Sequence, residues 1–191
     1  MTDVNQNPKQ KRNKIILIVV VIVVVCLVAC GVAYFALRNA VTNAVQLDPA
    51  KIKSYASQIT DYDLPVGYKE EGGTSTFGVI SVIISDASRQ NMIYLIQAPN
   101  NSTDPDNFLR TVVAYQKNNP ITWTSIDAKV YAIRGTKSPI TIYDGIAQNG
   151  QKYRAWIGKF TGRGGQAFII IVGPSATWKD SVAEAFLDSM K

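Results

Sequence analysis

Pairs of carboxylates are the first residues in this sequence that could do chemistry. Asp61 and Asp63 lie two positions apart, and so do Asp104 and Asp106. Such pairs in a loop can ligate a hard cation such as Ca²⁺, but this ion prefers about six to eight oxygen ligands and neither stretch supplies them. Asp104 followed by Pro105 is typical of a helix N-cap and first helical residue, so we expect capping here rather than metal binding.

Residues that usually carry enzyme catalysis are scarce. The sequence contains no histidine, and its two cysteines, Cys26 and Cys30, both lie in an apolar run near the N-terminus. Histidine triads and histidine metal sites are therefore excluded, and no G-x-S-x-G or S-x-x-K motif accompanies any serine. Folding could still bring Glu70, Asp127 and Asp144 together for acid–base chemistry. We predict no catalytic, metal-binding or cofactor-binding residue and keep an enzyme of unknown reaction as the alternative.

The glycine-rich stretch Gly162-Arg163-Gly164-Gly165 has two interpretations. Its backbone N–H groups and its arginine could hold an anion. It lacks the Lys-Ser/Thr that ends a phosphate-binding P-loop, and a strand-like run follows it where a P-loop has a helix. We expect a tight connection between two strands, in which glycine adopts backbone angles that other residues avoid.

Large aromatic residues fall mostly on the predicted strands: Trp123, Trp156 and Trp178, with Tyr131, Tyr143 and Tyr153. Such side chains can form a platform for a carbohydrate or a peptide, but a small sheet also uses them for its core. We expect core packing. Arg154 and Trp156 are two residues apart in one predicted strand, so they share a face of it.

The positive charge of the chain is concentrated at its N-terminus. The formal net charge is +6, yet residues 1–38 carry five basic side chains against one acidic, and the remaining residues carry fifteen against thirteen. A nucleic-acid surface needs clustered Lys and Arg that neutralise phosphates. The nearly neutral remainder therefore predicts no nucleic-acid partner.

The apolar run extends from Ile15 to Leu37, twenty-three residues without a charge between Lys14 and Arg38. A helix of this length spans about 34 Å, which is enough for the hydrocarbon core of a bilayer, about 30 Å thick. A core helix of a soluble domain would show polar residues on one side, and this run does not. We predict a single transmembrane helix over residues 15–37.

Basic residues before this run predict its orientation. Lys9, Lys11, Arg12 and Lys14 precede it directly, whereas Arg38 alone follows it closely. Because cytoplasmic flanks are enriched in Lys and Arg, we expect residues 1–14 to form a cytoplasmic basic tail and the chain after about residue 38 to lie outside the cell membrane. Residues 38–63 would then form a stalk and an amphipathic helix, and residues 64–191 an extracytoplasmic domain.

The same residues allow a second kind of anchor. Leu27-Val28-Ala29-Cys30 resembles the signal of bacterial lipoproteins, in which Cys30 would become the lipidated first residue. However, the run stays apolar to Leu37, whereas a cleaved signal usually has an apolar region of about 7–15 residues. We favour an uncleaved signal-anchor in a bacterial protein and keep lipidation at Cys30 as the alternative.

Hydrophobic periodicity divides the rest of the chain into helices and strands. Apolar residues recur at helical spacing between residues 48 and 60, 104 and 118, and 178 and 190. Strand-like runs cover residues 77–84, 92–97, 121–134, 140–147, 152–160 and 167–172. Asn149-Gly150 predicts a two-residue hairpin between two of these runs. This order predicts the α+β class, with a mostly antiparallel sheet of about six strands covered by helices.

Over residues 64–190 this order resembles that of PsbP-type proteins of photosynthetic membranes and their bacterial relatives. The resemblance rests on a glycine-turned hairpin before the last strand, on Phe168-Ile169-Ile170-Ile171-Val172, on Gly173-Pro174-Ser175, and on a closing helix that ends Phe186-Leu187-Asp188-Ser189-Met190. It implies a PsbP-like sandwich. It also implies a non-enzymatic accessory module that binds protein or membrane partners.

Together these features predict a single-pass, membrane-tethered accessory or binding module on the outer side of the cell membrane, without a cofactor. Its expected partners are the lipid bilayer and another membrane or envelope protein. The alternatives are a lipoprotein with the same outer domain and an extracytoplasmic enzyme of unknown reaction.

Overall fold

The computed structural model describes residues 45–76, 78–98 and 120–191. Several predictions fall outside these residues, namely the transmembrane helix Ile15–Leu37 with its basic tail, Cys30, and the helix between residues 104 and 118. In the part of the chain that is described, no helix is long and apolar enough to cross a membrane.

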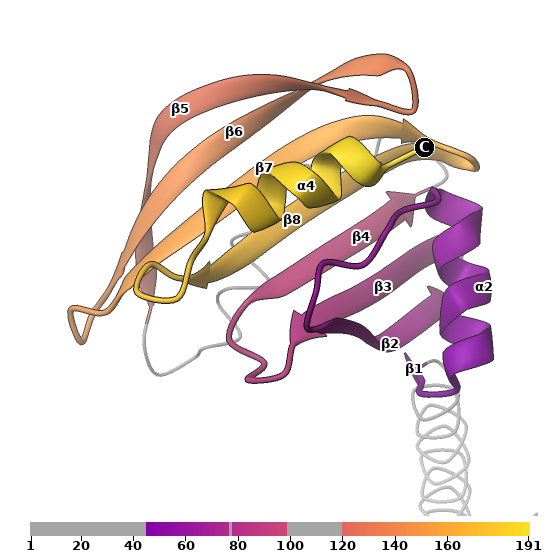
Figure 1. The fold of residues 1–191 in the computed structure, drawn as a ribbon, viewed down its shortest axis with the longest axis horizontal. Coiled ribbons are helices and arrows are strands. Elements are labelled where there is room, and N and C mark those ends of the chain that lie inside the picture. Colours follow the sequence, from indigo (N-terminus) through magenta and orange to yellow (C-terminus); the bar gives the residue numbers. More distant parts are fainter. Residues whose placement is uncertain (1–44, 77, 99–119) are drawn as a thin grey trace, which may run out of the picture. The chain divides into compact units, whose positions relative to one another are not determined.

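An antiparallel sheet forms the centre of the fold (Figure 1). Its strands are β1 (Val45–Gln46), β2 (Tyr68–Thr76), β3 (Val79–Asp86), β4 (Met92–Ala98), β5 (Ile121–Ile133), β6 (Thr136–Ala147), β7 (Lys152–Gly162) and β8 (Gly165–Pro174). They lie in the order β1-β2-β3-β4-β8-β7-β6-β5, and every neighbouring pair is antiparallel. Two described helices, α2 (Pro49–Ile59) and α4 (Asp180–Ser189), complete an α+β fold, as expected.

The sheet has two more strands than the sequence predicted. β1 has only two residues, and β2 reads YKEEGGTST, whose charges and glycines hide the alternation that marks a strand. β2 nevertheless pairs with β3 from Tyr68, opposite Asp86, to Thr76, opposite Val79. Pairing with a strongly apolar neighbour, rather than its own propensity, makes this segment a strand.

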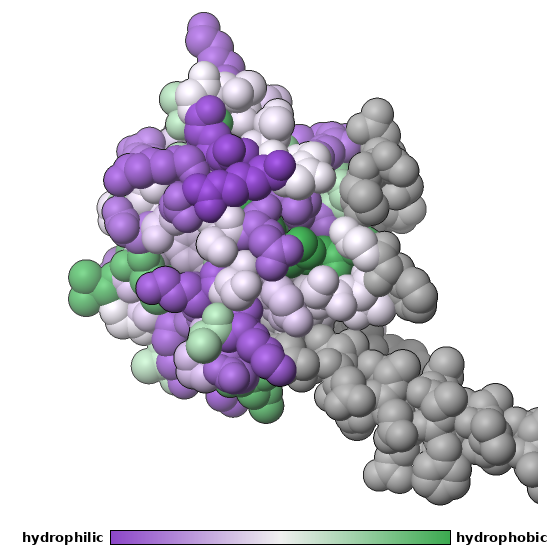
Figure 2. All heavy atoms as spheres, turned by 90° about the vertical axis from the view of Figure 1, so that its right-hand side faces the viewer, coloured by the Kyte–Doolittle hydropathy of each residue, from purple (hydrophilic) through white to green (hydrophobic). Residues whose placement is uncertain are grey.

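The main core lies between one face of the sheet and both helices. α2 contributes Ile52, Ala56 and Ile59 at helical spacing, and α4 contributes Phe186 and Leu187. They pack on alternate residues of the strands, such as Ile80, Val82 and Ile84 of β3. Figure 1 shows α4 lying over β7 and β8. The side of the molecule that carries α2 is largely hydrophilic, with small, separate hydrophobic patches (Figure 2).

Local hydrogen bonds set both ends of α2. The carboxylate of Asp48 accepts from the backbone N–H of Ala50 at 2.9 Å, and Pro49 is the first helical residue, as the sequence predicted. After the helix, Asp61 and Lys191 exchange two backbone hydrogen bonds, of 3.0 and 3.3 Å. The hydroxyl of Thr60 also donates to the carbonyl oxygen of Lys191 at 2.9 Å. The end of α2 is therefore bonded directly to the last residue of the chain.

The opposite face of the sheet carries a second, smaller apolar cluster. Ala155, Ile157 and Ile170 form its buried centre. Tyr94, Trp123, Tyr143 and Val172 pack around them and are partly buried. The sheet is thus apolar on both faces in its middle, around β7 and β8.

The turn between β6 and β7 differs from the predicted two-residue hairpin. The N–H of Gly150 donates to the carbonyl of Ala147 at 2.8 Å, and the N–H of Ala147 donates to Gln151 at 2.9 Å. Gly150 has a φ of +82°, whereas the φ of Asn149 is not positive. A two-residue loop of type I′ requires positive φ at both positions, so this is the three-residue form in which a left-handed glycine follows the turn.

Candidate functional site

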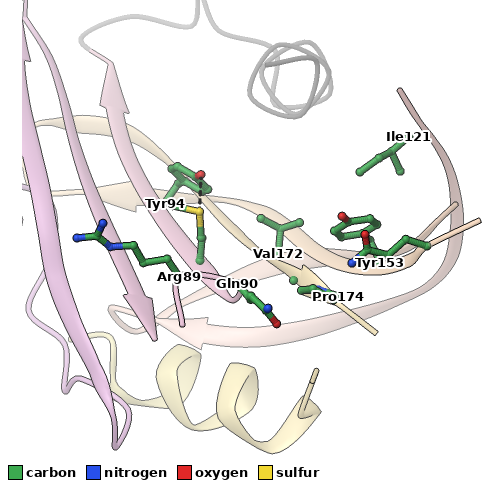
Figure 3. Close-up of a pocket in the computed structure, with 10 residues that line it drawn as sticks. Arg89, Gln90, Tyr94, Ile121, Tyr153, Val172 and Pro174 are labelled. Atoms are coloured by element: carbon green, nitrogen blue, oxygen red, sulfur yellow. Dashed lines mark hydrogen bonds between the residues drawn. The ribbon is translucent and has the colours of Figure 1, made fainter. Parts of the chain in front are cut away.

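A pocket of about 240 Å³ lies at one end of the sheet (Figure 3). It is formed where β4 and β7 begin and β8 ends, beside the first residue of β5. Its apolar and aromatic lining residues are Met92, Tyr94, Ile121, Tyr153, Val172 and Pro174, together with Gly173. Its polar residues are Arg89, Gln90 and Gln151.

The strand order explains why these residues meet. β4 and β7 run in the same direction because each is antiparallel to β8, which lies between them. Gln90 and Gln151 each come just before one of these strands and so reach the same end of the sheet. The register places Met92 opposite Val172. The wall of the pocket therefore continues across the strands.

A close contact holds the turn between β3 and β4 against the end of β8. A Cβ atom on Gly173 would lie 2.1 Å from Oδ1 of Asn91, so this position accepts only glycine while Asn91 stays in place. Nδ2 of Asn91 donates to Asp86 at 2.8 Å and to Thr177 at 3.4 Å. Oδ1 of Asn91 is buried and has no hydrogen-bond partner in the described part of the molecule. This packing fixes one side of the pocket.

The carboxylate of Asp86 organises the same turn. It accepts hydrogen bonds from the side chains of Ser88 and Asn91 and from the backbone N–H of Gln90, at 2.8 to 3.0 Å. Burial alone would raise the pKa of Asp86, but the hydrogen bonds from Asn91 and Ser88 outweigh it and leave the pKa lowered. Asp86 is therefore a charged acceptor that holds Gln90 at the edge of the pocket.

Arg89 contributes its stem to the pocket but not its charge. Its backbone is left-handed, with a φ of +56°. Its guanidinium donates to Glu71 at 2.8 and 3.3 Å and points away from Val172 and Tyr153 (Figure 3). Hydrogen bonds from Arg89 and then Lys69 lower the pKa of Glu71 to about 2. The pocket itself is therefore close to neutral.

The groups in the pocket that can form hydrogen bonds with a ligand are neutral. Gln90 and Gln151 each carry a donor and an acceptor in one amide group. The Tyr94 hydroxyl lies 3.1 Å from the sulfur of Met92, and burial raises its pKa, so the phenol stays protonated. Tyr153 of β7 is 9% exposed and forms the β7 side of the pocket wall. This arrangement can hold a small uncharged group with an apolar surface.

Two of the three carboxylates that could have formed an acid–base pair, Glu70 and Asp144, are kept apart. Asp144 accepts from Nε of Arg154 at 2.7 Å, and Glu70 accepts from the hydroxyl of Tyr62 at 2.7 Å. Glu70 lies on β2 and Asp144 on β6, with four strands between them. Asp127 is exposed and accepts from the N–H of Ala128 at 2.8 Å. Among the described residues, no three His, Cys, Asp or Glu side chains gather in a way that could hold a metal ion.

The glycine-rich stretch is a strand connection, as expected, and its arginine is already engaged. Gly162 pairs with Gly165, so Arg163 and Gly164 form a two-residue loop between β7 and β8. The guanidinium of Arg163 forms an ion pair with Asp61 and donates to the carbonyl of Ser57. These contacts oppose an anion site at the loop and a cation site at Asp61. Asp63 offers its N–H to the hydroxyl of Ser189, while Asp104 and Asp106 lie outside the described residues.

Aromatic residues divide between the two faces of the sheet. Trp156 is buried in the main core, with the rings of Tyr131 and Trp178 at centroid distances of 6.1 and 6.3 Å. Trp123 and Tyr143 pack in the smaller cluster on the other face. Core packing is thus confirmed for these five residues. Tyr153 is buried as well, as expected, and it also lines the pocket.

Arg154 shares its strand face with Trp156, as expected, and joins three elements. Its Nε lies 2.7 Å from Asp144 on β6, and its Nη1 lies 3.8 Å from Asp180 at the start of α4. Nε1 of Trp178 also donates to Asp180, at 2.5 Å. These contacts hold the first turn of α4 over the sheet and give Arg154 a structural role.

Sequence reasoning missed most of the pocket. Gln90 and Gln151 are polar residues in turns, and Met92, Tyr94 and Val172 read as ordinary strand residues. The sequence did contain one signal, because a glutamine precedes each of the two strands β4 and β7. It becomes informative only when β8 is known to lie between β4 and β7.

No family model matches the sequence, and no curated protein matches it. Among solved structures, the chain is similar to cyanobacterial PsbP from Synechocystis sp. PCC 6803, with 15% identity and a TM-score of 0.41 over 70% of this chain and 92% of that one. It is also similar to LpqN of Mycobacterium tuberculosis, described as involved in cell envelope biogenesis, with 12% identity and a TM-score of 0.34 over 68% and 79% of the two chains. The first of these is a PsbP-type protein, the kind of protein that the sequence resembles.

Proposed function

We propose that this protein is a non-catalytic binding module tethered to the outer side of a cell membrane, and that it holds a small uncharged group of its ligand in the pocket. The observation that carries this proposal is the composition of the pocket wall. Two tyrosines and two glutamines line it together with aliphatic residues, and none of its lining residues is a carboxylate. Carboxylates are among the commonest general acid–base groups, and the Tyr94 phenol, whose pKa burial raises, stays protonated.

The size of the pocket supports one small group rather than a whole cofactor. Pockets for drug-sized ligands and cofactors usually measure about 300–1,000 Å³, whereas this one measures about 240 Å³. Apolar walls with a few fixed polar groups are typical of sites that orient a ligand by hydrogen bonds. A ring or a side chain that carries an amide or a hydroxyl fits this combination.

Methionine methyl groups provide a direct test of binding. The chain has three methionines, of which Met92 lines the pocket and Met190 is buried in the main core. The full chain in detergent, labelled with ¹³C at the methionine methyls, is titrated with benzamide and, separately, with benzoate. We expect a saturable shift of the Met92 signal with benzamide. The dissociation constant should lie in the millimolar range, which corresponds to a binding free energy of about −4 kcal/mol. Met190 should stay unchanged.

Two results would count against the proposal. Benzamide that leaves the Met92 signal in place up to its solubility limit would exclude the pocket as a site for small neutral rings. Stronger binding of benzoate would show that the site selects charge instead. The variant Gln151→Ala, which removes one amide from the edge of the pocket, should weaken the benzamide response.

The membrane part of the proposal rests on the sequence. Lys9, Lys11, Arg12 and Lys14 before the apolar run Ile15–Leu37 predict a cytoplasmic N-terminus and an outer domain. A reporter that is active only outside the cytoplasm, fused after Lys191, should give signal. An inactive fusion of this kind, together with an active cytoplasmic reporter at the same position, would reverse the predicted topology.

A further inference from the structure

β5 is a long strand at the end of the sheet. In the described part of the chain it pairs with β6 alone, and it lies at one edge of the sheet in Figure 1. Two of its large apolar residues are strongly exposed, Ile126 at 48% and Val130 at 65%. Edge strands of monomeric proteins are usually short, covered or charged, because their free backbone groups can pair with another chain. A thirteen-residue edge with exposed apolar side chains fits an interface better than a free surface.

The register between β5 and β6 shows which residues of β5 direct their backbone groups to the free side. Ile133 pairs with Thr136 across the loop Arg134-Gly135, whose two residues both have positive φ, as in a two-residue hairpin. Such a loop is closed by a hydrogen-bonded pair, and hydrogen-bonded pairs then alternate along an antiparallel ladder. Counting back from Ile133, Val130 and Ala128 direct their backbone N–H and C=O groups away from β6.

A contact of Ala128 agrees with this count. Its N–H donates to the carboxylate of Asp127 at 2.8 Å, an exposed contact between neighbouring residues. The carboxylate thus takes the position that a carbonyl of a further strand would occupy. On the N-terminal side of Ala128, a β-bulge at Ile126, between Ser125 and Asp127, interrupts the regular edge of β5.

The residues on either side of Ala128 are complementary to those of a second copy of β5 that runs antiparallel to the first. If two copies of β5 pair about a two-fold axis at Ala128, Asp127 of each copy lies opposite Lys129 of the other, and the bulged residue Ile126 comes near Val130 of the other. A two-fold axis at Lys129 would instead place like charges opposite each other, which is destabilising. An axis between two residues would match an outward residue with an inward one and lose the hydrogen bonds.

We propose that β5 pairs with β5 of a second copy of this chain, antiparallel and centred on Ala128, so that the two sheets become one. Such an arrangement is an isologous two-fold interface, the commonest kind among homo-oligomers. Asp127 then releases the N–H of Ala128 to the carbonyl of Ala128 in the second copy. Lys129, already 2.9 Å from Glu184, gains Asp127 of the second copy as another carboxylate neighbour.

Cross-linking at the two-fold axis tests the register. The full chain in detergent, with Cys26 and Cys30 changed to Ser, carries Ala128→Cys and is oxidised mildly. Paired residues have Cα atoms about 4.5–5.5 Å apart, within the range of about 4.4–6.8 Å that a disulfide bridges. We expect a disulfide-linked dimer. The matched control Ala132→Cys, on the same edge, would lie about 26 Å from its copy and should stay monomeric.

Sedimentation equilibrium of the chain without introduced cysteines supplies the second measurement. We expect a dimer that Asp127→Lys weakens at least about tenfold, because two opposite-charge pairs become like-charge pairs. A circular dichroism spectrum like that of the unchanged chain would show that this variant is folded. A monomer at all concentrations overturns the proposal, as does equal cross-linking of the two cysteine variants. Cross-linking by Val130→Cys without cross-linking by Ala128→Cys overturns the register.

Discussion

The backbone N–H of Arg163, in the loop between β7 and β8, donates to the carbonyl oxygen of Ile59, the last residue of α2, at 2.9 Å. The guanidinium of the same residue donates to the carbonyl of Ser57 and pairs with Asp61. The last carbonyl groups of a helix have no partner within the helix and need one elsewhere. A residue about one hundred positions away in the sequence therefore completes α2, and its positive charge suits the C-terminal end of the helix dipole.

Replacing this arginine should destabilise the domain modestly. Arg163→Ala removes the ion pair with Asp61 and the guanidinium contact with Ser57, but leaves the backbone N–H that donates to Ile59. Because both ionic side chains are partly exposed, we expect a loss of about 1 kcal/mol in the free energy of unfolding. Urea denaturation of the fragment 45–191 measures it. Lys137→Ala, an exposed change of equal charge on β6, should have less effect, and equal losses would contradict the capping role.

The turn after β6 gives a second prediction. Gly150 has a φ of +82°, and a Cβ atom there would meet nothing within 4 Å, so any cost of substitution comes from the backbone. Gly150→Val should lower stability by about 1–3 kcal/mol, because β-branched residues resist left-handed angles. Gln148→Val, in the same turn at ordinary angles, should change it by less than about 0.5 kcal/mol. Equal denaturation midpoints for the two variants would remove the structural role of Gly150.

Acid should reveal the ion pairs of Glu71. Hydrogen bonds from Arg89 and Lys69 lower the pKa of Glu71 from 4.5 to about 2 in the folded protein. A lowered pKa stabilises the fold above the unfolded value, and this stability is lost as the pH falls through the folded value. The unfolding free energy should therefore decline between about pH 4.5 and 2. Glu71→Gln should flatten this part of the pH profile, and parallel profiles for both proteins would show that the pairs contribute nothing.

The nature of the anchor can be read from an intact mass. We expect the protein isolated from membranes to begin at or near Met1, because the apolar run continues to Leu37. A mass that starts at a diacylated Cys30 would establish the lipoprotein alternative. In that case Cys30→Ser would block processing, whereas Cys26→Ser, in the same apolar run, would not.

Local patterns in the sequence were sufficient to predict most single elements. Asp48-Pro49 marks the start of α2, and the continuous apolar run 167–172 marks β8, because capping and burial act on neighbouring residues. The strand β2 was not predicted because Gly72 and Gly73 have a low strand propensity. They are accommodated by the place of β2 in the sheet. A Cβ on Gly73 would lie 2.9 Å from the ring of Tyr55 on α2, a contact that no local pattern reveals.

Relationships between distant segments were the part that the sequence could not supply. The pairing of β4 with β8 joins residues 92–98 to residues 166–172, and together with the pairing of β7 with β8 it brings Gln90 and Gln151 to one end of the sheet. The exact form of the turn at Gly150 also depended on the register of the flanking strands. Candidate site residues were missed for the same reason, since none of them is unusual until the strand order is known.

The bond between Lys191 and Asp61 has a consequence for how the protein is made. Helix α4 supplies Phe186 and Leu187 to the core, and the backbone of Lys191 holds the segment that follows α2. The segment after α2 therefore gains these hydrogen bonds only after Lys191 has been synthesised and, on the predicted topology, has crossed the membrane. Contacts of such long sequence separation are slow to form. Until then, α2 relies on the core contacts of Ile52, Ala56 and Ile59 with the strands.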